Sequence, residues 1–156
     1  MVLPLLTRID HVGIACRDLE QAIGLYQRTF GLEVVSLEVN EAQGVREAML
    51  QVASGAAGNN GSYVQLLEPL APDTPVGKFL ARRGEGIHHI GYGVADIGEA
   101  LSAVGATGVR LVDERPRHGS MGASIAFLHP ADLGGVLTEL VQFVTIPDPL
   151  IQGERD

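Results

Sequence analysis

The sequence has little of what marks disulfide-rich or nucleic-acid-binding proteins. Its single cysteine, Cys16, can form no internal disulfide, so the fold does not depend on an oxidising compartment. Lysine and arginine number 11 against 19 aspartate and glutamate, and the net charge of -8 argues against a nucleic-acid surface. This charge does not exclude an anionic small molecule, because one cation or a few local donors can reverse the field inside a pocket.

Long hydrophobic runs are also missing. The amino-terminal stretch MVLPLLTRID is apolar over only a few residues and has no basic segment before them. A secretory signal needs both features, and a membrane span needs about 20 apolar residues. We therefore expect a cytoplasmic protein without a membrane partner. The 156 residues and the 46% hydrophobic content fit one globular domain that can bury a core.

The chain contains an internal repeat. The segment DHVGIACRDLEQAIGLY, from Asp10, matches HHIGYGVADIGEALSAV, from His88, at an offset of 78 residues. A second match sets YVQLLEPL against VLTELVQF and, with a one-residue slip, places Gln65 on Glu139. The first match pairs His11 with His89, Gly13 with Gly91 and Asp18 with Asp96. The two halves therefore carry the same order of structural elements.

Each half is expected to form a β-α-β-β-β module. Apolar and β-branched runs predict strands in HVGIAC, EVVSLEV, REAMLQVA and SYVQLLEP, and then in IHHIGYGV, VRLVDE, ASIAFLHP and GVLTELVQF. Asp18 is placed to cap the first helix, and Gly31 to end it in a left-handed conformation. The second helix is IGEALSAVGA. The loop SGAAGNNG, from Ser54, is expected to be a surface hairpin.

The predicted boundaries follow from this scheme. Module one covers about 8–70 and module two about 87–145, with a linker over about 71–86 and a polar tail over 146–156. The linker includes a short helical stretch at 76–82. Because a module of about 65 residues is marginal alone, we expect both to pack as one α+β body with a shared core.

Polar residues occupy matching places in otherwise apolar strands of the two halves. Burying an amide or a carboxylate costs several kcal/mol unless the group is paired or binds a cation. Two imidazoles, an amide oxygen and a carboxylate suit Co²⁺, Mn²⁺, Zn²⁺ or Ni²⁺. Taken singly, such residues are more often structural, but the repeat favours a metal site. The four predicted ligands are His11, Gln65, His89 and Glu139. By strand alternation His88 is expected to face away from His89 and to be structural or to support the ligands.

The modules and several strings resemble the vicinal-oxygen-chelate superfamily, which includes glyoxalase I, extradiol dioxygenases, fosfomycin-resistance proteins and methylmalonyl-CoA epimerases. The strings QGVREAML, VQLLEPL, GIHHIGYGV and IAFLHP are similar to those of the epimerase family, and the resemblance spans about residues 8–145. It implies a single domain over 1–156, in which two tandem modules form a half-closed barrel around a metal site. It also implies the same four metal ligands, cobalt as the usual metal, an acyl-CoA substrate and a homodimer.

The resemblance further implies that Glu47, in QGVREAML, is a catalytic base. Its apolar neighbours Val45 and Met49 favour a desolvated carboxylate with a raised pKa, as a weak carbon acid requires. The implied reaction is a proton transfer that interconverts (2R)- and (2S)-methylmalonyl-CoA through an enolate. It needs an acid on the opposite face of the substrate, and Glu139 is the candidate. Possible cations for CoA phosphates are Lys78, Arg115 and Arg117, although exposed cations are usually only solvated.

Two alternatives stay open. A glyoxalase I-like enzyme on the same fold also moves a proton next to a metal-bound oxygen pair, and the four ligands alone do not exclude it. A non-catalytic member that only binds a ligand is the second alternative, and the complete ligand set with Glu47 argues against it. An iron dioxygenase fits less well, because its facial triad leaves out a ligand pair of the first module, and that pair, His11 and Gln65, is present here.

Overall fold

The computed structural model describes residues 5–54 and 61–143; the predicted polar tail and most of the predicted hairpin loop lie outside these residues. The first half of the chain forms β1 (Leu6–Ala15), α1 (Leu19–Phe30), β2 (Glu33–Asn40), β3 (Val45–Ala53) and β4 (Ser62–Pro69). Helix α2 (Pro75–Arg83) follows. The second half forms β5 (Gly86–Val94), α3 (Ile97–Ala106), β6 (Arg117–His118), β7 (Ser124–Leu128) and β8 (Thr138–Gln142).

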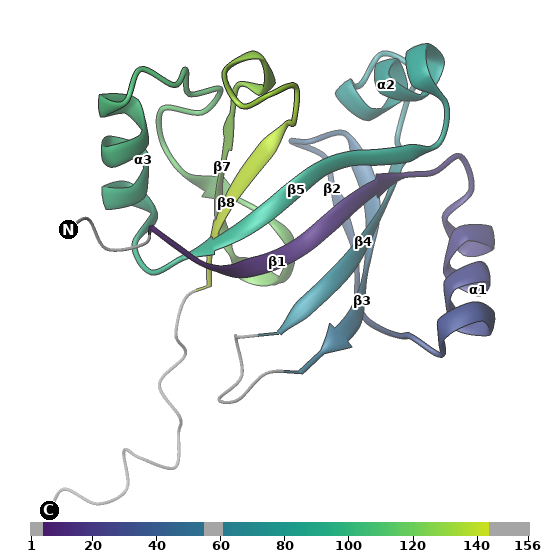
Figure 1. Ribbon diagram of the computed structural model, residues 1–156. Coiled ribbons are helices and arrows are strands. Elements are labelled where there is room, and N and C mark those ends of the chain that lie inside the picture. Colours follow the sequence, from purple (N-terminus) through teal and green to yellow (C-terminus); the bar gives the residue numbers. More distant parts are fainter. Residues whose placement is uncertain (1–4, 55–60, 144–156) are drawn as a thin grey trace, which may run out of the picture.

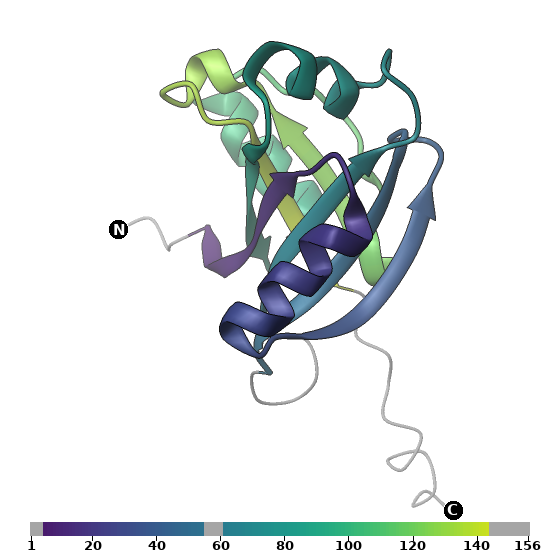
Figure 2. The same ribbon diagram turned by 90° about the vertical axis from the view of Figure 1, so that its right-hand side faces the viewer.

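All eight strands belong to one sheet in the order β2-β3-β4-β1-β5-β8-β7-β6. Each half contributes four neighbouring strands, with the parallel pairs β1/β4 and β5/β8 in matching places. The antiparallel pair β1/β5 joins the halves at the centre of the sheet, and α1 and α3 lie at opposite ends (Figure 1). Figure 2 shows the sheet curving around an inner face, with α1 on the outside. The predicted α+β fold of two tandem modules in a half-closed barrel is confirmed.

The two repeated helices begin and end where the sequence predicts. The carboxylate of Asp18 accepts from the Gln21 amide at 2.9 Å, and Asp96 caps α3 in the same way. Gly31 ends α1 with a φ of 68°, a left-handed conformation that glycine adopts without steric penalty. Each helix packs an apolar side on the outer face of its own half of the sheet, at Leu19 in α1 and at Leu101 in α3. The central strands are therefore held from outside, and their inner face is left for a site.

The strand predicted in VRLVDE is wrong. Leu111 forms only an isolated bridge to Leu128, and the strand of this region is instead the two-residue β6. The backbone amides of Val112 and Asp113 both donate to the carbonyl of Phe127. The Asp113 carboxylate then accepts from the Phe127 amide at 2.9 Å. A side chain thus takes the place of a backbone partner, and regular pairing stops.

Candidate active site

Two rows of residues cross the centre of the sheet and are related by the internal repeat. In one row, Gly13 of β1 pairs with Gln65 of β4 on one side and with His89 of β5 on the other. In the second row, Gly91 of β5 pairs with Glu139 of β8 and with His11 of β1. Strand register therefore places one histidine, one glycine and one amide or carboxylate in each row.

The glycine in each row makes room for the histidine ring of the neighbouring strand. A Cβ atom on Gly13 would lie 2.2 Å from Cε1 of His89, and one on Gly91 would lie 2.2 Å from Cε1 of His11. Such distances are far shorter than any van der Waals contact, so neither position tolerates a side chain as the rings now lie. The two glycines therefore allow each ring to lie close against the backbone of the neighbouring central strand.

The rings meet the Glu139 carboxylate at this centre. Nε2 of His11 lies 3.0 Å from Nε2 of His89 and 3.6 Å from Oε1 of Glu139. Nε2 of His89 lies 3.3 Å from Oε2 of the same carboxylate. All three side chains are buried, and their ligand atoms lie within 4.8 Å of one another. Two imidazole nitrogens and a carboxylate oxygen in such a cluster form a donor set for a divalent cation.

The amide of Gln65, which lies in the same row as His89, contacts a second carboxylate. Its Nε2 donates to Oε2 of Glu47 at 3.0 Å and to Oγ of Ser120 at 2.9 Å. Its Oε1 is buried and has no hydrogen-bond partner within the described part of the chain. A buried carbonyl oxygen without a partner costs about 1–3 kcal/mol. A cation at the cluster would supply that partner, and the residues therefore fit one.

The residue before each histidine orients its ring, which strand alternation did not predict. Ile9 and His11 pair with the adjacent residues Tyr92 and Gly91, so Asp10 is the extra residue of a β-bulge. His88 is the extra residue of a second bulge, at the position that the repeat matches to Asp10. Nδ1 of His11 lies 2.7 Å from Oδ2 of Asp10, and Nδ1 of His89 lies 2.9 Å from Nδ1 of His88.

These contacts leave both Nε2 atoms facing the cluster. Asp10 is itself buried and accepts from the Arg8 guanidinium at 2.8 Å, which fixes the carboxylate. A histidine that ligates a metal commonly binds such a partner through its second ring nitrogen, because the contact fixes the ring and its tautomer. The prediction that His88 faces away from His89 is therefore wrong, because the bulge brings the neighbouring side chains together.

The electrostatics of the site favour a bound positive charge. Burial raises the pKa of Glu139 to about 7, and the nearby Glu47 and Asp10 charges add to the shift. Burial also raises the pKa of Glu47, with a further contribution from Glu38 on the neighbouring strand. Burial alone would lower the pKa of His11, but the Glu139 and Asp10 carboxylates outweigh it and raise the pKa.

The pKa of His89 shifts in the opposite direction to that of His11. Burial, together with the charges of His11 and His88, holds the pKa of His89 well below its usual value. A neutral imidazole is the form that binds a metal. The site therefore offers one neutral ring and two carboxylates with raised pKa values.

One residue of the site, Ser120, was missed at the sequence level. It lies in a short 3-10 turn, Ser120–Gly122, and its hydroxyl hydrogen-bonds to Glu47 as well as to Gln65. The next residue, Met121, has a φ of 58°, which is rare outside glycine. Its amide donates to Glu38 at 3.1 Å, so the turn of module two is attached to module one. The sequence signal for this turn is the small-residue string HGSMGAS, and it is weak.

The sequence model of the Glyoxalase/Bleomycin resistance protein/Dioxygenase superfamily matches residues 10–127. A solved structure of methylmalonyl-CoA epimerase in complex with methylmalonyl-CoA and NH4+ is 52% identical, with a TM-score of 0.87. The match covers 92% of this chain and 99% of that one. A variant of the Streptomyces coelicolor methylmalonyl-CoA epimerase, in complex with 2-nitronate-propionyl-CoA, is also 52% identical, with a TM-score of 0.86 and coverage of 90% and 99%.

A third relative is the ethylmalonyl-CoA/methylmalonyl-CoA epimerase of Cereibacter sphaeroides. It is 35% identical over 137 residues, which are 86% of this chain and 97% of the relative. The similarity extends over both modules and so includes the strands that carry His11, Glu47, Gln65, His89 and Glu139. The resemblance read from the sequence is confirmed. The chain belongs to the methylmalonyl-CoA epimerase family of the glyoxalase/bleomycin resistance protein/dioxygenase superfamily.

Proposed function

We propose that this protein interconverts the (2R) and (2S) epimers of methylmalonyl-CoA by moving the proton on the α-carbon of the thioester. One observation carries the proposal: the Gln65 amide, in the same row of strand partners as His89, hydrogen-bonds to the buried carboxylate of Glu47, and its oxygen is unpaired within the described residues. A proton acceptor and a cation site are thus joined through one side chain. The solved relatives bind methylmalonyl-CoA or a nitronate analogue of its acyl group, which supports this substrate class.

Glu47 is the proposed base. A base for a weak carbon acid needs a raised pKa, and burial provides it here. The hydrogen bonds from Gln65 and Ser120 hold both carboxylate oxygens, so the group is oriented before the substrate arrives. When bound, a divalent cation supplies positive charge that stabilises the enolate oxygen.

Glu139 is the proposed acid that returns a proton to the opposite face. Burial raises its pKa to about 7 in the cation-free site, so the carboxyl can take up a proton when it leaves or loosens at the cation. His11 and His89 both contact this carboxylate and limit its movement. The assignment of Glu139 to both ligation and proton transfer is part of the proposal.

The proposed ligands are His11, Gln65, His89 and Glu139. This donor set suits Co²⁺, with Mn²⁺, Zn²⁺ and Ni²⁺ as alternatives. The NH4+ in one solved relative makes a monovalent cation a further occupant to test. The proposal also includes a homodimer and a cytoplasmic location, where the buried, free Cys16 stays reduced. No helix in the described parts of the chain has the length and apolarity to cross a membrane.

The test is to supply one pure epimer of methylmalonyl-CoA and follow the approach to an equal mixture by chiral chromatography. The protein as purified is compared with protein treated with a chelator and then given back Co²⁺, or NH4+ alone. We expect conversion to fall after chelation and to return with the effective cation. The hemithioacetal of glutathione and methylglyoxal is the comparison substrate. Turnover of that compound, without conversion of the thioester, would favour the glyoxalase alternative instead.

A further inference from the structure

We infer that Arg82 and Arg83 bind the phosphate groups of the substrate's coenzyme A arm, at the mouth of a groove that leads inward to His89. The inference rests on the proposed function, because it assigns the nucleotide end of the same substrate. The two arginines are neither proposed cation ligands nor proposed proton-transfer residues. The geometry of the groove provides the first argument.

The groove has an outer and an inner part. The outer part is a cavity of about 340 Å³ between α2, the start of β5 and the loop before β8, and both arginines line it. The inner part, of about 190 Å³, is lined mainly by apolar side chains, among them Phe127. Pro75, His88, His89 and Leu137 line both parts. A thioester at the cluster can therefore extend its arm outward past these residues.

One wall of the outer part is a continuous row of contacting side chains from the cluster to the mouth. The rings of His89 and His88 lie 5.2 Å apart, and the rings of His88 and Phe79 lie 5.1 Å apart. The guanidinium carbon of Arg83 then lies 5.9 Å from the centroid of the Phe79 ring. This row of side chains joins His89 of the cluster to the last turn of α2.

The arginine pair also has its charge available. Arg17, Arg46, Arg110 and Arg117 each pair with a carboxylate, whereas no ion pair of Arg82 or Arg83 is found over 5–54 and 61–143. Glu85, the nearest acidic residue in the sequence, contacts the backbone amide and the guanidinium of Arg17. In a protein with a net charge of -8, a polyanionic arm needs such a local positive region. Guanidinium groups suit phosphate because they can donate in pairs.

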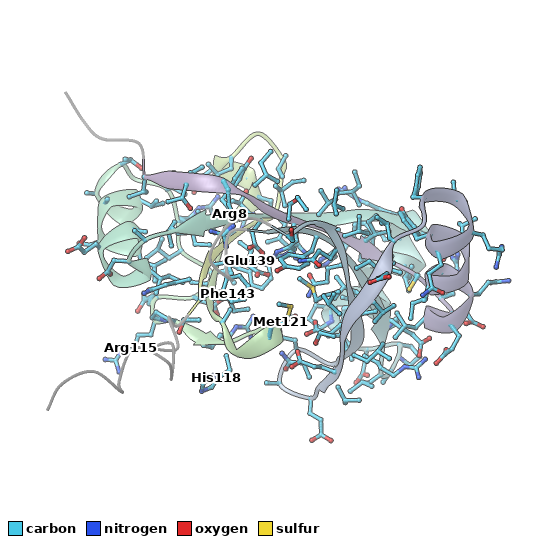
Figure 3. All side chains as sticks on the ribbon, turned by 90° about the horizontal axis from the view of Figure 1, so that it is seen from below. Arg8, Arg115, His118, Met121, Glu139 and Phe143 are labelled. Atoms are coloured by element: carbon cyan, nitrogen blue, oxygen red, sulfur yellow. The ribbon has the colours of Figure 1, made fainter. Side chains whose placement is uncertain are left out.

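The three cations that the sequence suggested for CoA phosphates, Lys78, Arg115 and Arg117, lie in less suitable places. Arg115 points outward at the edge of the molecule, away from Glu139 (Figure 3). Arg117 lines the inner part, but it pairs with Asp113 at 3.3 Å and stacks on the Phe127 ring. Lys78 lies on α2 but does not line the groove. The structure therefore favours the last turn of α2.

The test compares methylmalonyl-CoA with methylmalonyl-pantetheine, which has the same reacting group but no phosphates. Arg82→Gln and Arg83→Gln are combined in one variant. We expect its preference for the CoA thioester, measured as the ratio of the two kcat/KM values, to fall about tenfold or more, and high salt to lower the preference of the natural protein. The matched control is Arg28→Gln, because Arg28 occupies the last turn of α1 and lies outside the groove.

A basic residue in the last turn of a helix also favours the helix dipole. If that were the whole role of the pair, the variant would lose stability and keep its substrate preference, and the inference would be overturned. An equal fall in kcat/KM for both thioesters would overturn the inference as well. Binding of coenzyme A alone, measured by calorimetry, separates this inference from the proposed function. A natural protein that binds coenzyme A through this pair but turns over neither thioester contradicts only the proposed function.

Discussion

Nε2 of Gln65 donates to Oε2 of Glu47 at 3.0 Å, and the oxygen of the same amide is buried without a hydrogen-bond partner in the described structure. The nitrogen side of one amide thus holds the proposed base, and its oxygen side is free for the cation. In the proposed mechanism, a cation bound through this oxygen would fix the amide and therefore the proposed base. Glu139 belongs to the ligand cluster, whereas Glu47 does not. A mutation of Glu47 can therefore separate proton transfer from cation binding.

Replacing Glu47→Gln is expected to lower the rate of epimerisation by about a thousandfold, since a neutral amide cannot accept the α-proton. Cation and substrate binding, measured by calorimetry, should stay within about threefold of the natural protein. The exposed Glu20→Gln serves as the control for loss of a carboxylate. Turnover within tenfold of the natural rate would show that Glu47 is not the base.

Gly91 lies against a histidine ring, whereas Gly105 has space around it, so alanine at these two positions should have opposite effects on stability. Gly91→Ala puts a methyl group into the His11 ring and should destabilise the protein by about 1–3 kcal/mol and weaken cation binding. Gly105→Ala lies in α3, where a methyl group meets only Leu111 at 3.8 Å, and should stabilise by about 0.5–1 kcal/mol. Urea unfolding measures both changes. Equal effects would show that the ring can move aside without loss.

Asp10 is expected to act on cation binding by fixing the His11 ring. Asp10→Asn keeps the size of the side chain but removes the charge that holds Nδ1–H, so the cation should bind about 10–100-fold more weakly. In the cation-free protein, the strongly hydrogen-bonded Nδ1 proton of His11 should give a downfield NMR signal that the variant lacks. Asp18→Asn is the control, because asparagine caps a helix as well as aspartate does. A variant with unchanged affinity and signal would contradict this role.

Glu139 should make the cation-free protein sensitive to pH. A carboxyl with a pKa of about 7 when folded and about 4.5 when unfolded favours the fold fully below pH 4.5, and this contribution is lost as the pH rises through 7. The shift corresponds to at most about 3 kcal/mol. Glutamine at this position does not titrate. The free energy of unfolding of Glu139→Gln minus that of the natural protein should therefore be higher at pH 8 than at pH 5, as measured by urea unfolding with a chelator present. A difference independent of pH would contradict the assignment.

The repeat in the sequence was enough to predict most of the order of elements and the convergence of His11, His89 and Glu139. Equal positions in two copies of a module become equal positions in one sheet, so His11 and His89 had to come from matching strands. Their ligand roles, and the predicted boundaries between modules, linker and tail, stay predictions.

Other features depend on departures from regular strand geometry. Alternation assigns Asp10 and His88 to the wrong side, because each is the extra residue of a bulge and a bulge cannot be read from a period of two. Ser120 reaches Glu47 only because the curved sheet brings a turn of the second module over the first. The missing strand at VRLVDE has a similar origin, because the Asp113 side chain competes with backbone pairing.

The most direct test of cation-assisted proton transfer is to incubate one epimer of methylmalonyl-CoA with the protein in heavy water. The proposed mechanism predicts that deuterium enters the α-carbon together with inversion, that a chelator stops the exchange, and that Co²⁺ restores it. Absence of deuterium in the cation-loaded protein would contradict the mechanism. Exchange that continues at full rate after removal of the cation would contradict the role of His11, Gln65, His89 and Glu139.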